Sequence, residues 1–122
     1  MPKLDMLGPF RFSQTIIDVE VPDERMGNYT LGYTEDEYFI VKYVGRSDTN
    51  LRGELKYYLN LGYTHFKFSV AQSRKAAFEK ECRNYHDFGG DDGKLDNQNH
   101  PNRPDGLYLK CPVCSMSDQD DE

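Results

Sequence analysis

Two short segments rich in Tyr, Val, Ile and Phe constrain the fold of this chain more than any other feature. They run over residues 28–34 and 38–44, and the polar residues Thr34-Glu35-Asp36-Glu37 lie at the junction between them. Aromatic and β-branched residues favour strands, and a short polar link between two such runs is typical of a hairpin. We therefore expect an antiparallel β-hairpin that begins near Gly27.

A helix and a third strand are expected after the hairpin. The side chains at 47–49 offer capping oxygens, after which Leu51, Leu55 and Leu59 share one helical face until Gly62. Residues 63–70 then alternate between the two faces of a strand, which predicts that Phe66, Phe68 and Val70 point into a core.

A second helix is expected to begin after Ser73 and to end near Gly89-Gly90. Its apolar stripe contains Phe78, Cys82 and Tyr85. The predicted order is therefore β-β-α-β-α, which is an α/β fold with a small three-stranded antiparallel sheet flanked by helices.

The two ends of the chain differ from this middle part. Residues 1–26 contain three prolines and one alternating run, Thr15 to Val21, so we expect an extended N-terminal arm with at most one edge strand. Residues from Asp91 onward are rich in Asp, Asn, Gly and Pro, which predicts a loop. We expect one domain over 27–114 and a disordered acidic tail over 115–122.

Charge is unevenly distributed along the chain. The net charge is −6, but residues 39–86 hold nine basic and four acidic side chains. A basic middle between acidic ends leaves room for a surface that binds phosphates, although it could equally form solvated helix faces.

No apolar run approaches the ~20 residues that span a bilayer, and the amino terminus lacks the apolar segment of a signal peptide. We therefore expect a cytoplasmic protein without a membrane partner. In a reducing compartment, three cysteines indicate metal binding or free thiols rather than disulfides.

Four residues could form a zinc knuckle at the carboxyl end. Cys82 and His86 are one turn apart on the second predicted helix, and Cys111 and Cys114 form a Cys-Pro-Val-Cys motif. Three thiolates and an imidazole would complete a closed, structural zinc site, with His100 as the alternative fourth ligand. The competing interpretation is that Cys82 is a small core residue and His86 stabilises the end of the helix.

The order of several short motifs resembles the GIY-YIG nuclease superfamily. Gly27-Asn28-Tyr29 opens the first strand and Tyr43-Val44-Gly45 closes the second, and a helix follows at once. Ala76-Ala77-Phe78-Glu79 is similar to the helix of that family that carries a metal-binding glutamate. Leu95-Asp96-Asn97 resembles the element that supplies its asparagine. The resemblance covers about residues 27–104, and the β-β-α-β-α order agrees with the family's small catalytic module.

This resemblance implies metal-dependent hydrolysis of phosphodiester bonds in DNA or RNA. Tyr29 would match the family's proposed general base, Tyr43 would position water or phosphate, and Asn97 would form hydrogen bonds near the site. Glu79 would bind Mg²⁺ or Mn²⁺, hard cations that suit carboxylate and water oxygens. Considered without the family, both tyrosines could simply pack on the sheet.

One position departs from the family pattern. Where the family has an arginine on its first helix, this chain has Glu54, whose charge would repel phosphate. Two other arginines could supply the missing positive charge at the catalytic site. Arg52 is about 200° away from position 54 on the helix, so it could do so only if the register of the match differs. Arg46 follows the second motif directly and could be recruited instead. Tyr58 also stands where the family has a histidine.

Three functions therefore remain open. The first is an endonuclease, and the second is a catalytically impaired relative that binds nucleic acid or protein through the basic middle segment. The third is a zinc-knuckle interaction module whose tyrosines belong only to the core, and this alternative predicts no Mg²⁺ or Mn²⁺ dependence.

Overall fold

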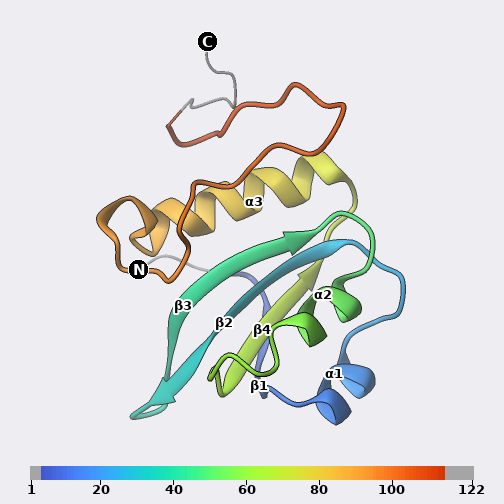
Figure 1. The fold of residues 1–122 in the computed structure, drawn as a ribbon, viewed down its shortest axis with the longest axis vertical. Coiled ribbons are helices and arrows are strands. Elements are labelled where there is room, and N and C mark those ends of the chain that lie inside the picture. Colours follow the sequence, from blue (N-terminus) through green and yellow to red (C-terminus); the bar gives the residue numbers. More distant parts are fainter. Residues whose placement is uncertain (1–3, 115–122) are drawn as a thin grey trace.

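The computed structural model describes residues 4–114 and folds them into one antiparallel sheet with helices on both faces (Figure 1). The elements are β1 Leu7–Arg11, α1 Gln14–Glu20, β2 Gly27–Glu35, β3 Tyr38–Ser47, α2 Leu51–Tyr57, β4 His65–Val70, α3 Arg74–Asp87 and the 3-10 helix η1 Gly90–Asp92. The predicted α/β class is confirmed. The tail predicted over 115–122 lies outside the described residues.

The sheet has four strands in the order β1-β4-β2-β3, so the prediction of three strands is wrong. The additional strand β1 pairs antiparallel with β4 at the sheet edge. Phe10 fixes it there, because its ring centroid lies 5.6 Å from that of Phe66 and 6.0 Å from that of Phe68. Pro9 lacks a backbone donor, which an edge strand tolerates. The segment can therefore pair with β4, although the sequence predicted an extended arm.

The run from Thr15 to Val21, expected to supply at most an edge strand, forms helix α1 with Val21 as its C-cap. Ser13 caps the helix by accepting a hydrogen bond from the Ile16 backbone. Ile17 and Val21, four residues apart, are both buried. Burial of this helical stripe outweighs the strand preference of the β-branched residues around it.

The other predicted elements form, although α2 ends at Tyr57, before the predicted stop at Gly62, and Val70 is only partly buried. β2 and β3 form the hairpin, and Ser73 caps α3 by accepting from the Ala76 backbone. At the start of α2 the capping side chain is Asn50, whose Oδ1 accepts from the Gly53 N–H, rather than one of the residues at 47–49. Phe66 and Phe68 are buried as expected.

The two faces of the central strand β2 carry different cores. Tyr29 and Leu31 pack with residues of α1, α2 and β4. Asn28 alternates to the opposite face, where its Nδ2 donates to the Ala77 carbonyl of α3. The sheet therefore lies between α3 on one face and α1 and α2 on the other, as Figure 1 shows.

The segment after η1 runs back along α3 (Figure 1). Its start is held against the sheet because the Asp96 N–H donates to the carbonyl of Lys42 in β3. Leu95 packs with Val44 and Tyr85, so the segment belongs to the core on the α3 face. Within residues 4–114, no helix is long and apolar enough to cross a membrane.

Candidate functional site

A cluster of tyrosines lies at the edge formed by β3. Tyr29 of β2 stacks on Tyr43 of β3 at a centroid distance of 6.3 Å, and Tyr58 packs against both rings. The Tyr43 and Tyr58 hydroxyls are 3.3 Å apart. The tyrosines of both motifs thus share one cluster, and Tyr29 is almost completely buried, with 1% of its surface exposed.

The position of the Tyr29 ring explains why the second motif ends in glycine, at Gly45. A Cβ atom at this position would lie 2.4 Å from the Tyr29 hydroxyl oxygen and 2.3 Å from its Cζ. The Tyr29 ring therefore crosses β3 directly over Gly45. It reaches α2, where its hydroxyl donates to Glu54 Oε2 at 3.0 Å.

The structure settles which residue of α2 faces this site. Glu54 points to Tyr29, whereas the Arg52 guanidinium donates to the Val21 and Asp18 carbonyls of α1. Arg52 therefore points to α1 in this structure and does not face the tyrosine cluster. Burial raises the pKa of Glu54, although the hydrogen bond from Tyr29 and the charge of Arg46 oppose the shift.

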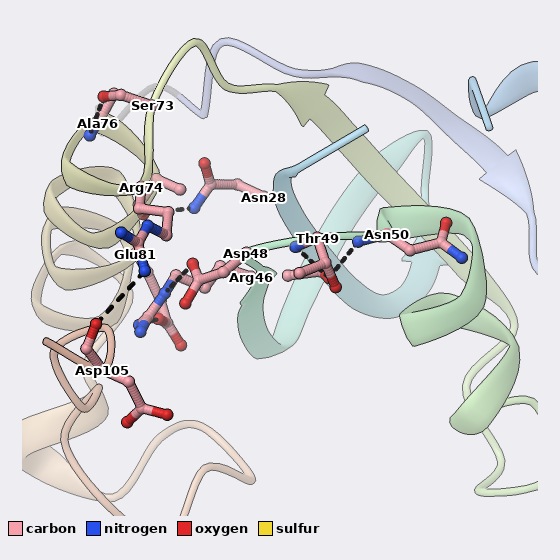
Figure 2. A network of polar contacts seen from close by, with 12 residues as sticks. Asn28, Arg46, Asp48, Thr49, Asn50, Ser73, Arg74, Ala76, Glu81 and Asp105 are labelled. Carbon is pink, nitrogen blue, oxygen red and sulfur yellow. Dashed lines mark hydrogen bonds and ion pairs between the residues drawn. The ribbon is translucent and has the colours of Figure 1, made fainter. Parts of the chain in front are cut away.

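Arg46 is the basic side chain beside the cluster. Its Nη1 lies 2.5 Å from Glu81 Oε1 and its Nε lies 2.9 Å from Asp48 Oδ1, as Figure 2 shows. Its guanidinium carbon lies 5.3 Å from the centroid of the Phe78 ring. Burial disfavours the charge on Arg46, but the two carboxylates outweigh burial and raise its pKa. The guanidinium therefore stays charged and is held by both carboxylates.

Glu81, and not Glu79, is the carboxylate that α3 directs toward the sheet. Glu81 is 8% exposed and pairs with Arg46 (Figure 2). Glu79 is only partly buried and lies about 200° away on the helix. The placement predicted for Glu79 is therefore wrong. Glu81 lies three residues after Phe78 and four before Tyr85, so the apolar stripe itself was a signal for its burial.

The ionisation of these groups limits the chemistry. Burial raises the pKa values of Tyr29 and Tyr43, whereas a tyrosine that removes a proton from water needs a lowered pKa. Burial also raises the pKa of Glu81 to about 7, against the opposing charge of Arg46. Tyr29 thus remains a neutral hydrogen-bond donor in this arrangement.

Asn97 forms two hydrogen bonds with the edge strand. Its Oδ1 accepts from the Val44 N–H at 2.9 Å, and its Nδ2 donates to the Val44 carbonyl at 2.8 Å. The amide side chain pairs with β3 as a neighbouring strand would. This pairing fixes the 96–102 segment beside the tyrosines.

A polar pocket of about 400 Å³ opens between this segment and the sheet. It is lined by Tyr43, Glu81, Asp96, Asn97, Gln98, Asn99, His100, Pro101 and Asn102. Tyr43 contributes to both the tyrosine cluster and the pocket, so the two features form one continuous site.

A group of four potential metal ligands adjoins the pocket through His100. His86, His100, Cys111 and Cys114 each direct one ligand atom to a common point, and these atoms lie within 4.8 Å of one another. The two imidazole Nε2 atoms are 3.2 Å apart, and Cys114 Sγ lies 3.5 Å from His100 Nε2.

These separations are those of ligands around one small ion. Bond lengths of about 2.0–2.1 Å to nitrogen and 2.3 Å to sulfur in a tetrahedron separate two nitrogens by about 3.3 Å, and nitrogen from sulfur by about 3.5 Å. The four residues could therefore hold a metal such as zinc.

A polar contact at Nδ1 also orients the ring of each histidine. His86 Nδ1 lies 2.7 Å from Asp91 Oδ2, and His100 Nδ1 lies 2.9 Å from the Pro101 carbonyl. A carboxylate or carbonyl on the far nitrogen fixes the ring and its tautomer in metal sites. Both Nε2 atoms are thereby left to face the common point.

Cys82 is absent from this group in the described part of the chain, and His100 occupies the place expected for it. Cys82 is fully buried in a small cluster with Phe78 and Cys111. Burial and the neighbouring Cys111 raise the pKa of its thiol, which disfavours the thiolate that a metal needs. The sequence predicts His100 only as the alternative ligand, because spacing along the chain does not reveal the path of the segment that brings it to α3.

Comparison with protein-family models, with curated proteins and with solved structures finds no match.

Proposed function

We propose that this protein is a GIY-YIG-like endonuclease that hydrolyses phosphodiester bonds of DNA or RNA with the help of Mg²⁺ or Mn²⁺. The observation that carries the proposal is the meeting of Glu81 and Tyr43 in one polar pocket, with Arg46 paired to Glu81. A carboxylate that can hold a cation, a positive charge that can meet a phosphate and a hydroxyl that can orient water suit such a reaction.

Glu81 would hold the divalent cation in place of Glu79. Mg²⁺ is commonly bound by one or two carboxylates together with water and substrate phosphate, so a single buried glutamate suits it. When bound, the ion supplies a Lewis acid for the phosphate and lowers the pKa of a water ligand.

The remaining roles belong to the chain itself. Arg46 pairs with both Glu81 and Asp48, so a cation at Glu81 would release the Nη1 of Arg46 to approach a phosphate oxygen while Asp48 still holds its Nε. Tyr43 is half-buried and lines the pocket, where its hydroxyl can orient water. Tyr29 is too buried to contact water and positions Glu54 and Tyr43 instead.

The activity is expected to be slow. Glu54 places a carboxylate where the GIY-YIG family, which this sequence resembles, has an arginine. The charge of Arg46 is already neutralised by two carboxylates. A missing electrostatic contact of this kind typically costs about 10²–10³ in rate.

His86, His100, Cys111 and Cys114 would hold zinc in a structural role. Two thiolates and two imidazoles form a closed Cys₂His₂ set, which leaves no position open for a reacting water. By holding the same ion as the other three residues, His86 would join α3 to the carboxyl-terminal segment that forms the pocket wall. Such a thiolate site suits a reducing compartment, so cytoplasmic location remains our prediction.

A second candidate function is a non-cleaving binding module for nucleic acid or protein. The observation that favours it is the Tyr29 hydroxyl, which is buried and donates to Glu54, so the residue matched to the family's general base cannot act as one. This module would retain the fold and the zinc centre without any dependence on Mg²⁺ or Mn²⁺.

A cleavage assay separates the two functions. Labelled single-stranded and duplex DNA and RNA are incubated with the protein, with and without Mn²⁺. The first function predicts Mn²⁺-dependent products that Glu81→Gln abolishes and the matched control Glu79→Gln retains. Equal activity of both variants would refute the role of Glu81, and absence of cleavage on every substrate would favour the binding module.

A further inference from the structure

We infer that the pocket lined by Tyr43, Glu81 and residues 96–102 binds one unpaired nucleobase, so that single-stranded or looped nucleic acid is the preferred substrate. This inference rests on the proposed function, because it takes nucleic acid as the ligand. It adds which part of the nucleic acid enters the pocket and which substrate class follows.

The size of the pocket suits a single nucleotide unit. Its volume of about 400 Å³ lies in the range of about 300–1,000 Å³ that small-molecule sites occupy. A duplex cannot enter such a pocket, but a base that has left the stack can do so.

Without a cation at Glu81, the charge of the pocket suits a base better than a phosphate. Its lining residues within 4–114 include the carboxylates of Glu81 and Asp96 and no lysine or arginine. Carboxylates accept hydrogen bonds from the amino groups of bases and repel phosphates. While Glu81 holds no cation, as in the binding test below, the phosphates of a bound strand should therefore remain outside the pocket.

Amide side chains supply the remaining recognition chemistry. Gln98, Asn99 and Asn102 line the pocket and are exposed, and each offers both donors and an acceptor. The Watson–Crick edge of a base presents the same mixture, and it is available only when the base is unpaired. Tyr43, which is half-buried, also lines the pocket and can contact the base there.

The wall of the pocket is held in place before any ligand arrives. Asn97 is paired with Val44, Asp96 Oδ2 accepts from the Tyr63 hydroxyl at 2.8 Å, and His100 belongs to the metal group. A preorganised wall lowers the entropic cost of binding, which favours a recognition site over an incidental surface hollow.

Two lysines lie beside the pocket where a strand backbone could pass. The Lys42 carbonyl accepts from the Asp96 N–H, and Lys42 Nζ lies 3.3 Å from the Lys94 carbonyl. Phosphates outside the pocket can contact these side chains while the base occupies the interior.

Binding is measured by fluorescence anisotropy without added Mg²⁺ or Mn²⁺, so that cleavage does not enter the result. The probes are a labelled single-stranded DNA of about 12 nucleotides, within the site sizes of single-strand binders, its RNA counterpart, and the same DNA strand in a duplex. Gln98→Ala/Asn99→Ala is the test variant. The matched control, Asn60→Ala/Gln72→Ala, removes two exposed amides outside the pocket.

We expect the single strands to bind more tightly than the duplex, and the test variant to weaken single-strand binding at least about fivefold, as loss of two hydrogen bonds predicts. The control should bind as the wild type does. Equal binding of duplex and single strand, or no difference between test and control variants, would overturn the inference. Pocket-dependent binding without Mn²⁺-dependent cleavage would instead refute only the nuclease function.

Discussion

Replacement of Glu54 by arginine tests the electrostatics of the site most directly. Glu54 is half-buried and accepts the hydrogen bond of the Tyr29 hydroxyl at 3.0 Å. Its charge also interacts with that of Arg46. Glu54→Arg removes a negative charge and adds a positive one beside the tyrosines, and the Tyr29 hydroxyl can then accept a hydrogen bond from the guanidinium.

The expected gain follows from the role of one cationic contact. A preorganised donor at developing negative charge is worth about 10²–10³ in rate, but that figure applies to ideal placement. Arg46, Asp48 and Glu81 around the site were not selected with an arginine at 54, so part of the gain is lost. We expect Glu54→Arg to increase Mn²⁺-dependent cleavage by at least about tenfold.

The assay compares initial cleavage rates with excess substrate for wild type and three variants. Glu54→Gln removes the charge without adding one and should give an intermediate rate. Arg52→Ala should change the rate little, because Arg52 donates to the carbonyls of α1. Thermal melting of each variant shows whether a rate change merely reports unfolding.

An unchanged cleavage rate in Glu54→Arg would refute this reasoning. If Glu54→Arg folds as the wild type does and cleaves no faster, the charge at 54 does not limit the reaction. If Arg52→Ala abolishes cleavage, the catalytic cation comes from Arg52, and the placement of α2 that we describe is not the active one.

Three further outcomes test the zinc centre and the tyrosine cluster. Elemental analysis of protein purified without added metal should find about one zinc per chain, and Cys111→Ser should lower both this ratio and the melting temperature, because metal binding is coupled to folding; folded wild type without zinc would contradict it. Gly45→Ala should destabilise the protein by about 1–3 kcal/mol in chemical denaturation, since the new Cβ meets the Tyr29 ring, and the cost should fall when Tyr29 is also changed to Leu; an equal cost in both backgrounds would refute the clash. Burial raises the folded-state pKa values of Tyr29 and Tyr43, so the stability they contribute is complete below the unfolded value of about 10 and decreases as the pH rises above it, and ultraviolet absorbance should show these phenols ionising only with alkaline unfolding.

Local rules predicted the elements whose signals agree with one another. The hairpin has aromatic strands and a polar turn, and α3 has both the Ser73 cap and an apolar stripe. The prediction for residues 15–21 was wrong because their β-branched side chains favour a strand while their spacing favours a helix. Only contact with the sheet and α2 decides between the two. The strand at 7–11 was not predicted because an edge strand that contains proline shows little alternation of apolar and polar residues. Its pairing with β4 also joins residues that are far apart in the sequence.

The candidate site divides in the same way. The sequence by itself determined that tyrosines and a glycine lie on adjacent strands, that a carboxylate lies on the last helix, and that Cys111 and Cys114 are close, because these relations follow from strand pairing, helical period and short spacing. Only the tertiary structure decided that Glu81, rather than Glu79, faces the sheet, because the choice depends on which face of α3 packs against Arg46. It also decided that His100, rather than Cys82, completes the group of four potential metal ligands. That choice depends on the path of the chain from Asn97, which is hydrogen-bonded to Val44, back along α3.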